Sequence, residues 1–585
     1  MTSTYSPAHR RRAVRLPSSV NELLPGRNAS RQPLLRMAVW MVPALVVGLA
    51  GFQRRWMSDD AYIYVRTVRQ ILAGNGPVFN AGERVESSTG TLWQWLLAAA
   101  GLARVDLATA AVYGGLLLTA AGFALAGLGA LRLHGNRAVL PLGSLVLLAL
   151  PPVWDFATSG LETGLATCWI AGAWLALTTR AQSLATSLLL GLGPLVRPDL
   201  GIVSVVFLGA QWLLARPSRQ GTLAGVAVAG ALPGTYEIFR AGYYGHLVPL
   251  PAVAKEASQS LWERGLGYLG DFSGPYLLWL PALFIAAAVL PSRGQRTERA
   301  TAPFGHSSPG RSRLLAALAP VVAGLLCWAY VIKVGGDFMH GRMLLPGMLL
   351  MLLPVFVVPV TRASALAAVG VGTWAVVCAG WLRIPYEGQM GPAGIADEHG
   401  VYALRNADAH PVHHTFAGAP WHLAHALEVQ QAERTGAPTL LLGGHDSMAA
   451  NSPSVTATYV VLGWNGAVVP LDGAALDPIG LAYPLAAHTQ RVDGGRVGHD
   501  KHLPAAWLAA DRGDAADLPS GLDPAHVNAA RHALRCGPLA DLQAATRDPL
   551  TPGRFLRNLA GSWARTSFRF PSDPVTAERE LCRGN

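Results

Sequence analysis

The chain has 585 residues, of which 51% are hydrophobic and only 14% are charged, and its mean hydropathy is +0.31. Soluble domains carry about a quarter charged residues, so this composition excludes an ordinary soluble protein and indicates a membrane protein with many spans. The net charge of +11 would suggest nucleic-acid binding in a soluble protein, but here we expect the excess arginine on cytoplasmic loops and no nucleic-acid partner.

The N-terminal segment 1–33 is basic and lacks the pattern of a cleavable signal peptide, which predicts a cytoplasmic tail followed by an uncleaved first span. Apolar runs then recur as far as residue 382. We expect eleven transmembrane helices, at residues 34–53, 108–131, 138–156, 160–178, 182–196, 200–215, 222–239, 274–290, 313–333, 343–360 and 364–382. The shorter apolar stretch 91–103 has tryptophans near one end and predicts an interfacial or re-entrant helix.

The distribution of arginine gives the expected orientation. With a cytoplasmic N-terminus, every loop on the cytoplasmic side contains arginine, namely 132–137, 178–182, 216–220, 291–313 and 361–362. The positive-inside rule favours this topology, and a full span at 91–103 would break the agreement. The longest of these loops, 291–313, is basic and rich in Ser, Gly and Pro, which predicts disorder.

The composition changes after residue 382. The segments LLLGG (440–444) and TYVVLGW (458–464) are typical of short strands, so we predict one extracytoplasmic, soluble α+β domain over 383–585. Cys536 and Cys582 are its only cysteines, and in an oxidising compartment they are the plausible disulfide pair. Its histidines lack a metal-ligand spacing, so we expect no metal site there. Trp464 is a candidate for stacking against a glycan.

Ionisable residues gather on the predicted outer face. Asp59 and Asp60 follow the first span, where they either cap a helix or carry chemistry. The other charged or titratable residues of this face are Glu86, Glu162, Arg197, His246, Lys255, Asp337, His340 and Arg342. Such groups are costly at a membrane boundary unless they pair or act on a ligand, so we predict a functional site here. Simple pairing of these groups at helix ends is the alternative.

This set of residues suits an enzyme that uses a lipid-linked sugar phosphate. Cations stabilise the departing phosphate, and a carboxylate accepts a proton from the acceptor or attacks the sugar. We assign the carboxylate to Asp59 or Asp60, with Asp59 as the more essential. The candidate phosphate ligands are Arg342, Lys255, His340 and Arg197. His246 fits either an interfacial position or a ligand, and Glu162 fits either a helix cap or a substrate contact.

Several segments resemble a known group of enzymes. They are DDAYIYVRTVRQILAGNGPVFNAGERVE (59–86), SGLET (159–163), RPD (197–199), AK (254–255), GGDFMHGRMLLP (335–346) and the tail from residue 536 to 582. These segments resemble the family of terminal β-(1→2)-arabinofuranosyltransferases of actinobacterial cell walls. More broadly, the acidic pair after the first span, the interfacial helix and the multi-span core are similar to the GT-C superfamily of polyprenyl-phosphate-dependent glycosyltransferases. The segment VESSTG (85–90) departs from the family pattern, which bears on sugar or acceptor contacts.

The resemblance implies transfer of arabinofuranose from decaprenyl-phosphoryl-arabinose to arabinan ends of arabinogalactan or lipoarabinomannan, outside the plasma membrane. It implies that Asp59 and Asp60 are the essential acidic pair. We expect sugar or acceptor contacts from Glu86, Asp337, Glu162 and His246. No cofactor is expected, and the sequence leaves a divalent cation open. The alternatives are a related glycosyltransferase with another sugar or acceptor, a lipid-linked sugar flippase, and a purely structural role.

Overall fold

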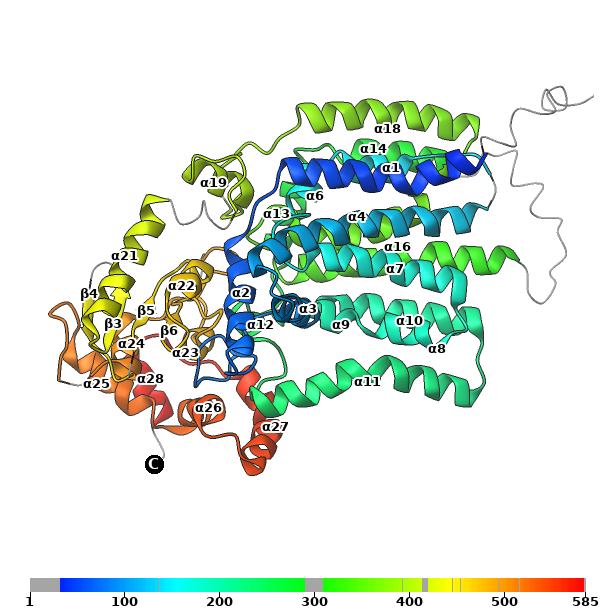
Figure 1. Ribbon diagram of the computed structural model, residues 1–585. Coiled ribbons are helices and arrows are strands. Elements are labelled where there is room, and N and C mark those ends of the chain that lie inside the picture. The colour runs from blue at the N-terminus through cyan, green and yellow to red at the C-terminus, as the bar shows by residue number, and fades with distance from the viewer. Residues whose placement is uncertain are drawn as a thin grey trace, which may run out of the picture.

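The computed structural model describes residues 32–582 except 136, 290–308, 392, 413–418, 444–445, 453, 493 and 515. The predicted tail 1–33 lies outside the described residues except for 32–33. Of the predicted disordered loop 291–313, residues 291–308 lie outside them, and 309–313 form the start of a helix instead. Figure 1 shows a bundle of long helices on one side and a domain of short helices and strands on the other. The segment 59–102 runs between the two parts.

The bundle is built from long apolar helices that run side by side (Figure 1). They are α1 (Gln32–Gln53), α4 (Leu107–His134), α7 (Thr163–Arg180), α10 (Gly201–Ala215), α11 (Arg219–Tyr243), α16 (Pro309–Lys333) and α18 (Arg362–Gly380). In the described part of the chain, 5 helices are long and apolar enough to cross a membrane: Arg36–Gln53, Leu107–His134, Pro198–Ala215, Gly310–Lys333 and Arg362–Gly380. The chain is thus a helical membrane protein.

Shorter elements complete the bundle, and several have a proline at their first or second residue, which fits the first turn of a helix but interrupts a continuing one. They are α5 (Leu142–Leu148), α6 (Pro151–Asp155), α8 (Leu184–Gly191), α9 (Gly193–Val196), η2 (Pro198–Leu200), α12 (Leu250–Ala254), α13 (Trp262–Ser273), α14 (Trp279–Val289), η3 (Arg342–Leu344), α17 (Leu345–Leu352) and η4 (Leu353–Val355). A two-stranded antiparallel ribbon pairs β1 (Val139–Leu140) with β2 (Val358–Pro359).

Close helix packing depends on glycine at two contacts. A Cβ atom added to Gly164 of α7 would lie 2.2 Å from the carbonyl oxygen of Gly115 in α4. One added to Gly191 of α8 would lie 2.0 Å from the carbonyl oxygen of Ala229 in α11. Small residues allow such approach of helix backbones, and dispersion contacts between helices then stabilise the bundle.

Two helices lie where the bundle meets the C-terminal domain. They are the amphipathic α2 (Asp59–Leu72) and the short α3 (Thr91–Leu102). Helix α3 corresponds to the predicted interfacial segment 91–103. Arg66 of α2 is buried and donates hydrogen bonds to backbone carbonyls of the C-terminal domain, including those of Gly466 and Val469, at 2.9 and 2.7 Å. Burial lowers the pKa of Arg66 to about 9. The hydrogen bonds from Arg66 to these carbonyl oxygens therefore fix helix α2 to the C-terminal domain.

The C-terminal domain is α+β. Its 4-stranded sheet has the order β4-β3-β5-β6, in which β3–β4 is antiparallel and β3–β5 and β5–β6 are parallel. The strands are β3 (Thr439–Gly443), β4 (Asp446–Ala449), β5 (Thr456–Thr458) and β6 (Ala474–Leu476). The helices are α19 (Glu398–Arg405), α21 (Pro420–Thr435), α22 (Leu462–Val468), α23 (Pro484–Ala487), α24 (Ala505–Arg512), α25 (Pro524–Ala533), α26 (Gly537–Arg547), α27 (Pro552–Ser567) and α28 (Pro574–Leu581).

Two predictions for this domain were wrong. The expected strand 458–464 ends at Thr458, and residues 462–468 form helix α22, because Asp59 of α2 supplies a cap that local sequence does not contain. Trp464 is only 5% exposed, and its indole N–H donates to the carbonyl oxygen of His422 at 3.1 Å. It therefore packs in the core and offers no surface for a glycan.

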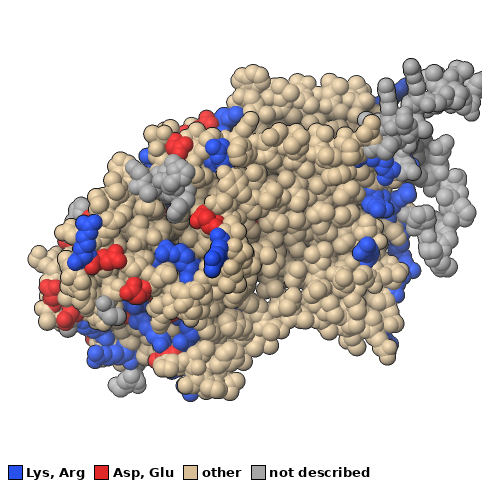
Figure 2. Space-filling view, in the orientation of Figure 1, with Lys and Arg blue, Asp and Glu red and all other residues tan. Residues whose placement is uncertain are grey.

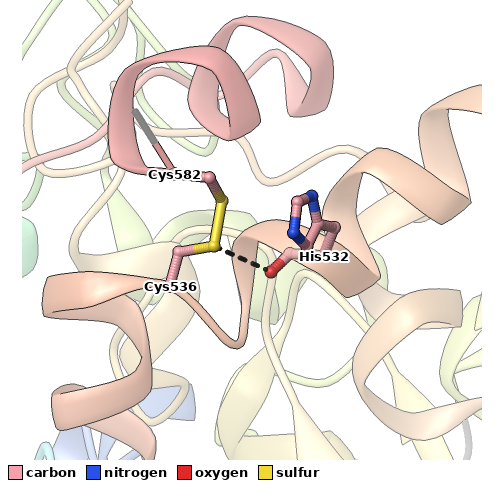
Figure 3. Close-up of side chains that lie close together, drawn as sticks. All are labelled: His532, Cys536 and Cys582. Atoms are coloured by element: carbon pink, nitrogen blue, oxygen red, sulfur yellow. Dashed lines mark hydrogen bonds between the residues drawn. A yellow bond between two sulfur atoms is a disulfide. The ribbon is translucent and has the colours of Figure 1, made fainter. Parts of the chain in front are cut away.

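A disulfide joins Cys536, before α26, to Cys582, after α28 (Figure 3). Among the described residues, one group of His, Cys, Asp or Glu has ligand atoms close enough for a metal ion, and it consists of these two cysteines and His532. Because both sulfur atoms are in the disulfide, no thiolate is left to bind a metal. The bond closes the end of the domain.

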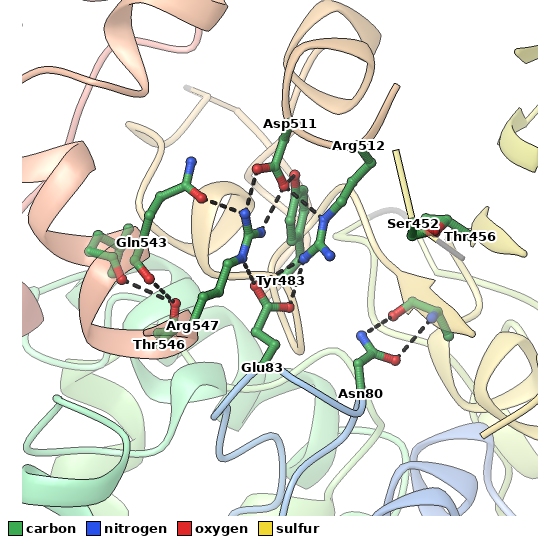
Figure 4. Close-up of polar contacts among 12 residues, drawn as sticks. Asn80, Glu83, Ser452, Thr456, Tyr483, Asp511, Arg512, Gln543, Thr546 and Arg547 are labelled. Atoms are coloured by element: carbon green, nitrogen blue, oxygen red, sulfur yellow. Dashed lines mark hydrogen bonds and ion pairs between the residues drawn. The ribbon is translucent and has the colours of Figure 1, made fainter. Parts of the chain in front are cut away.

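A buried ionic network joins the loop after α2 to the C-terminal domain (Figure 4). Glu83 accepts from Arg512 at 3.0 Å and from Arg547 at 2.8 Å. Asp511 accepts from Arg547 at 2.6 and 2.8 Å and from the hydroxyl of Tyr483 at 2.7 Å. Breaking a buried pair of this kind costs about 3–5 kcal/mol, so the network fixes the domain on the bundle.

Candidate active site

A cleft lies between the end of the bundle and the C-terminal domain, and it encloses about 1170 Å³, part of which is open to solvent. Its walls come from α2, the segment after Glu86, η2, α12, and the segment 336–343. The C-terminal domain contributes Leu481, Val497 and Gly498. Six of the predicted site residues line this cleft: Asp60, Glu162, Arg197, Lys255, Asp337 and Arg342.

Arg342 joins two acids of the cleft. Its Nε and Nη2 atoms donate to the two carboxylate oxygens of Asp337 at 2.7 and 3.0 Å. Its Nη1 atom lies 3.6 Å from Oδ2 of Asp60. Burial alone would raise the pKa of Asp337, but Arg342 and Lys255 hold that pKa below its usual value. Asp337 therefore stays ionised and fixes the guanidinium that faces Asp60.

Arg197 interacts with two acidic residues of the same cleft. Its Nε and Nη2 atoms donate to Asp199 at 2.6 and 2.8 Å, and its Nη1 atom lies 3.9 Å from Glu162. Glu162 also accepts a 2.9 Å hydrogen bond from the hydroxyl of Tyr64. Because its donors already have carboxylate partners, Arg197 organises the wall of the cleft more than it offers charge to a ligand.

Lys255 is held less tightly than either arginine. Its Nζ atom lies 4.0 Å from Asp337 and 5.1 Å from the centre of the Phe338 ring, and 29% of its side chain is exposed. A lysine ammonium that is partly exposed and loosely paired has donors left for an anion. Of the predicted phosphate ligands, Lys255 is therefore the best placed to bind one.

The two adjacent aspartates have different surroundings. The carboxylate of Asp59 is buried and accepts hydrogen bonds from the backbone N–H groups of Gly463 and Trp464, at 3.0 and 2.7 Å. It therefore caps α22, a helix of the other domain. Burial and the neighbouring charge of Asp60 raise the pKa of Asp59 to about 7. Asp60 faces the cleft, with 20% of its side chain exposed.

Besides Asp59, three predicted site residues do not line this cleft. Glu86 is neutralised by Arg240 of α11 at 2.6 Å and accepts from the Tyr236 hydroxyl at 2.7 Å. His340 faces a separate pocket of about 430 Å³, and its Nδ1 atom lies 2.7 Å from Asp271. His246 is buried with its Nε2 atom 3.3 Å from that of His488. The structure does not place these three residues in the cleft, and their contacts with sugar, acceptor or phosphate stay predictions.

Comparisons with known proteins identify the chain. The model of the AftB family C-terminal domain matches residues 430–579. A terminal β-(1→2)-arabinofuranosyltransferase of Mycobacterium tuberculosis is 34% identical over 92% of this chain and 97% of its own length. The chain belongs to this family. The enzyme of the same name from Corynebacterium glutamicum is 35% identical over 91% of this chain and 86% of its own length. No solved structure gives a significant match.

Four further residues lie in or near the cleft of this arabinofuranosyltransferase family member and were not predicted as site residues. They are Tyr64, Asp199, Arg264 and Glu398. Arg264 lines the cleft and lies 3.1 Å from Asp500. Glu398 begins α19, and its Oε2 atom is buried without a hydrogen-bond partner among the described residues. Burial, followed by the charge of Asp60, raises the pKa of Glu398 well above its usual value. Two of the four had a sequence signal, because Asp199 stands in the RPD segment and Tyr64 in the segment 59–86.

The C-terminal domain also holds the backbone next to Lys255. Glu256 has a left-handed backbone, with φ of 47°, which is unfavourable for a residue with a side chain. Its carboxylate is buried and lies 3.1 Å from Lys501 and 3.3 Å from Arg569. Arg569 also donates to the carbonyl oxygen of Val253 at 3.0 Å. We refer to Glu256, Lys501 and Arg569 as the Glu256 clamp.

Proposed function

We propose that this chain transfers arabinofuranosyl residues from decaprenyl-phosphoryl-arabinose to the arabinan termini of arabinogalactan or lipoarabinomannan. As a family member it is a glycosyltransferase, and both relatives are named for a β-(1→2)-arabinofuranosyl transfer in their printed names. The observation that carries the proposal is the convergence of Asp60, Arg342 and Lys255 in one cleft at the end of a membrane bundle. That position suits a donor with a lipid tail and a charged head.

The proposed step breaks the bond between the anomeric carbon and the phosphate oxygen. The acceptor hydroxyl oxygen forms the new bond, and its proton passes to Asp60. Lys255 stabilises the negative charge on the departing polyprenyl phosphate, as preorganised cations do in low-dielectric sites. Arg342, held by Asp337, orients the Asp60 carboxylate. These residues supply the charge and the proton acceptor, so the step as proposed needs no cofactor.

The proposed orientation places the cleft and the C-terminal domain outside the plasma membrane, with the N-terminus in the cytoplasm. Figure 2 shows Lys and Arg gathered at the bundle end opposite the C-terminal domain. The described turns at that end carry arginine and no acid; their arginines are Arg132, Arg137, Arg180, Arg216, Arg219, Arg311, Arg313 and Arg362. By the positive-inside rule, this distribution supports a cytoplasmic position for that end.

The proposed count remains eleven spans. Beyond the helices long enough to cross alone, shorter apolar helices occupy the predicted spans, at Leu184–Val196, Trp279–Val289 and Arg342–Val355. Broken helices are tolerated at membrane depth where neighbouring helices cover their free backbone groups. Helices α5 and α6 together occupy the predicted span 138–156 in the same way.

The test is a donor competition with purified full-length protein. A synthetic polyprenyl-phosphoryl-arabinofuranose and the matching mannose donor are offered together with a short arabinan, and the product linkages are analysed. We expect new terminal 2-linked arabinofuranose and no mannose. Transfer of mannose, or consumption of neither donor, would overturn the assigned sugar.

A further inference from the structure

Helix α27 has its polar and apolar faces reversed relative to a helix on the surface of a soluble domain. Its buried residues are the polar Asn558, Ser562 and Arg565. Its outward face carries Leu556, 63% exposed, and Trp563, 73% exposed. A surface helix of a soluble domain normally turns its apolar stripe toward the core. The outward apolar face of α27 is therefore without a partner in the described structure.

The polar inner face is held by hydrogen bonds at the end of a bundle helix. Asn558 Nδ2 donates to the carbonyl oxygen of Gly242 at 3.1 Å, and Arg565 Nε donates to that of Gly245 at 2.9 Å. Arg565 also lies 2.6 Å from Asp541. Figure 1 shows α27 beside the end of α11, where that helix leaves the bundle. These contacts fix which face of α27 points outward.

The outward face continues an apolar surface that already belongs to the bundle. Helix α11 exposes Leu232 and Ile238, at 51% and 58%, as expected for side chains that face lipid. The Phe555 ring of α27 packs directly against Gly242, where an added Cβ atom would lie 2.2 Å from it. The exposed side chains of α27 thus begin close to the point where the lipid-facing surface of α11 ends.

We propose that α27 is a membrane-docking helix that lies on the outer surface of the bilayer, with Leu556 and Trp563 at the boundary between headgroups and acyl chains. Tryptophan is favoured at this boundary because its ring is apolar and its N–H is polar. Arg557 is exposed beside Leu556, where a long cationic side chain reaches lipid phosphate. Lipid is the occupant because the face adjoins the surface of α11 and combines aromatic, aliphatic and basic side chains.

Docking of α27 would hold the C-terminal domain against the membrane next to the cleft. The chain leaves α27 at Ser567, and Arg569 follows two residues later in the Glu256 clamp. The same short segment therefore connects the docked helix to the backbone next to Lys255. This inference depends on the membrane character of the chain and is independent of the sugar that it transfers.

The test places nitroxide labels on the full-length protein in vesicles of phosphatidylethanolamine and phosphatidylglycerol. Cys168, Cys327 and Cys378 are first replaced by alanine, and the disulfide is kept. Single labels are attached to Leu556→Cys and Trp563→Cys. The matched control is Leu427→Cys on α21, which is 53% exposed in the same domain. Collision rates with oxygen, which concentrates in lipid, are compared with those of a water-soluble nickel complex.

We expect the ratio of oxygen to nickel collisions at residues 556 and 563 to be several-fold higher than at residue 427. An aqueous ratio at both α27 positions would overturn the proposal. Protection from both reagents would also overturn it, because it would show that protein, such as a second copy of the chain, covers this face. The substituted side chains are exposed, so the variants should fold, and the intact disulfide checks this.

Discussion

Asp59 and Asp60 are adjacent in the sequence, but their side chains make different contacts. Successive residues of an α-helix point about 100° apart, so the two carboxylates at the start of α2 meet different surroundings. Asp59 turns to the backbone of α22, 404 residues away in the chain, whereas Asp60 faces the cleft. The sequence favoured Asp59 as the more essential residue, and the structure favours Asp60 because both oxygens of Asp59 already accept hydrogen bonds.

Asp59→Asn should therefore act mainly on stability. Asparagine keeps one acceptor oxygen for the α22 cap and loses the other, so we expect the free energy of unfolding to fall by about 1 kcal/mol. The transfer rate of the folded protein should stay within about tenfold of wild type, because a positioned acid–base group accounts for larger losses. Thermal melting in detergent and an initial-rate assay check this. If Asp59→Asn melted at the wild-type temperature but had no transfer activity, the catalytic role would belong to Asp59.

Lys255→Met should weaken donor binding. Hydrogen bonds to charged groups contribute about 1.5–3 kcal/mol, so loss of the ammonium should raise the KM for the polyprenyl donor by about tenfold or more. Lys333→Met is the matched control, since Lys333 ends α16 and does not line the cleft. Equal KM values for the two variants would remove Lys255 from the phosphate site.

At the scale of elements, the C-terminal domain completes the cleft that the bundle begins. The Glu256 clamp holds a left-handed residue directly after Lys255, which costs about 1–3 kcal/mol unless the surrounding contacts enforce it. Both cations of the clamp come from the C-terminal domain. If Lys255 binds the donor phosphate as proposed, the domain acts on that site through the backbone.

Lys501→Met should thus raise the KM for the donor in the same direction as Lys255→Met, although Lys501 does not line the cleft. Lys501→Arg should restore most of the affinity, because it keeps the charge opposite Glu256. Steady-state kinetics on both variants, with melting temperatures to confirm folding, provide the measurement. A loss of stability in Lys501→Met without any change in KM would show that the clamp has no effect on donor binding.

The ionic network around Asp511 should give the protein an acid-sensitive interface. Burial alone would raise the pKa of Asp511, but Arg547 and Arg512 hold it well below the ordinary value of 3.8. The stabilisation is thus fully present above about pH 4 and is lost as the pH falls through the lower folded pKa. Asp511→Asn should lower the free energy of unfolding by about 3 kcal/mol at pH 7. Melting curves should show this difference shrinking below pH 4, and a constant difference down to pH 2 would contradict the assignment.

At the scale of the whole molecule, the sequence predicted the apolar helices, the family and one polar face, because these depend on composition and short motifs. The resemblance to the arabinofuranosyltransferase family is confirmed. Contacts between residues that are far apart in the sequence could not be predicted in this way. Glu86 points to Arg240, 154 residues later, and Asp59 points to α22. The left-handed Gly341, with φ of 70°, separates the directions of His340 and Arg342, although they stand two residues apart.

We assign the proton acceptor in arabinofuranosyl transfer to Asp60, which faces the cleft beside Arg342. The most direct measurement compares wild type, Asp60→Asn and Asp59→Asn in single-turnover transfer from polyprenyl-phosphoryl-arabinofuranose to a short arabinan, at equal amounts of folded protein. We expect the rate for Asp60→Asn to fall by at least about 100-fold, the usual scale for a positioned acid–base group, while Asp59→Asn remains active. Near-normal transfer by Asp60→Asn would show that Asp60 is not the proton acceptor.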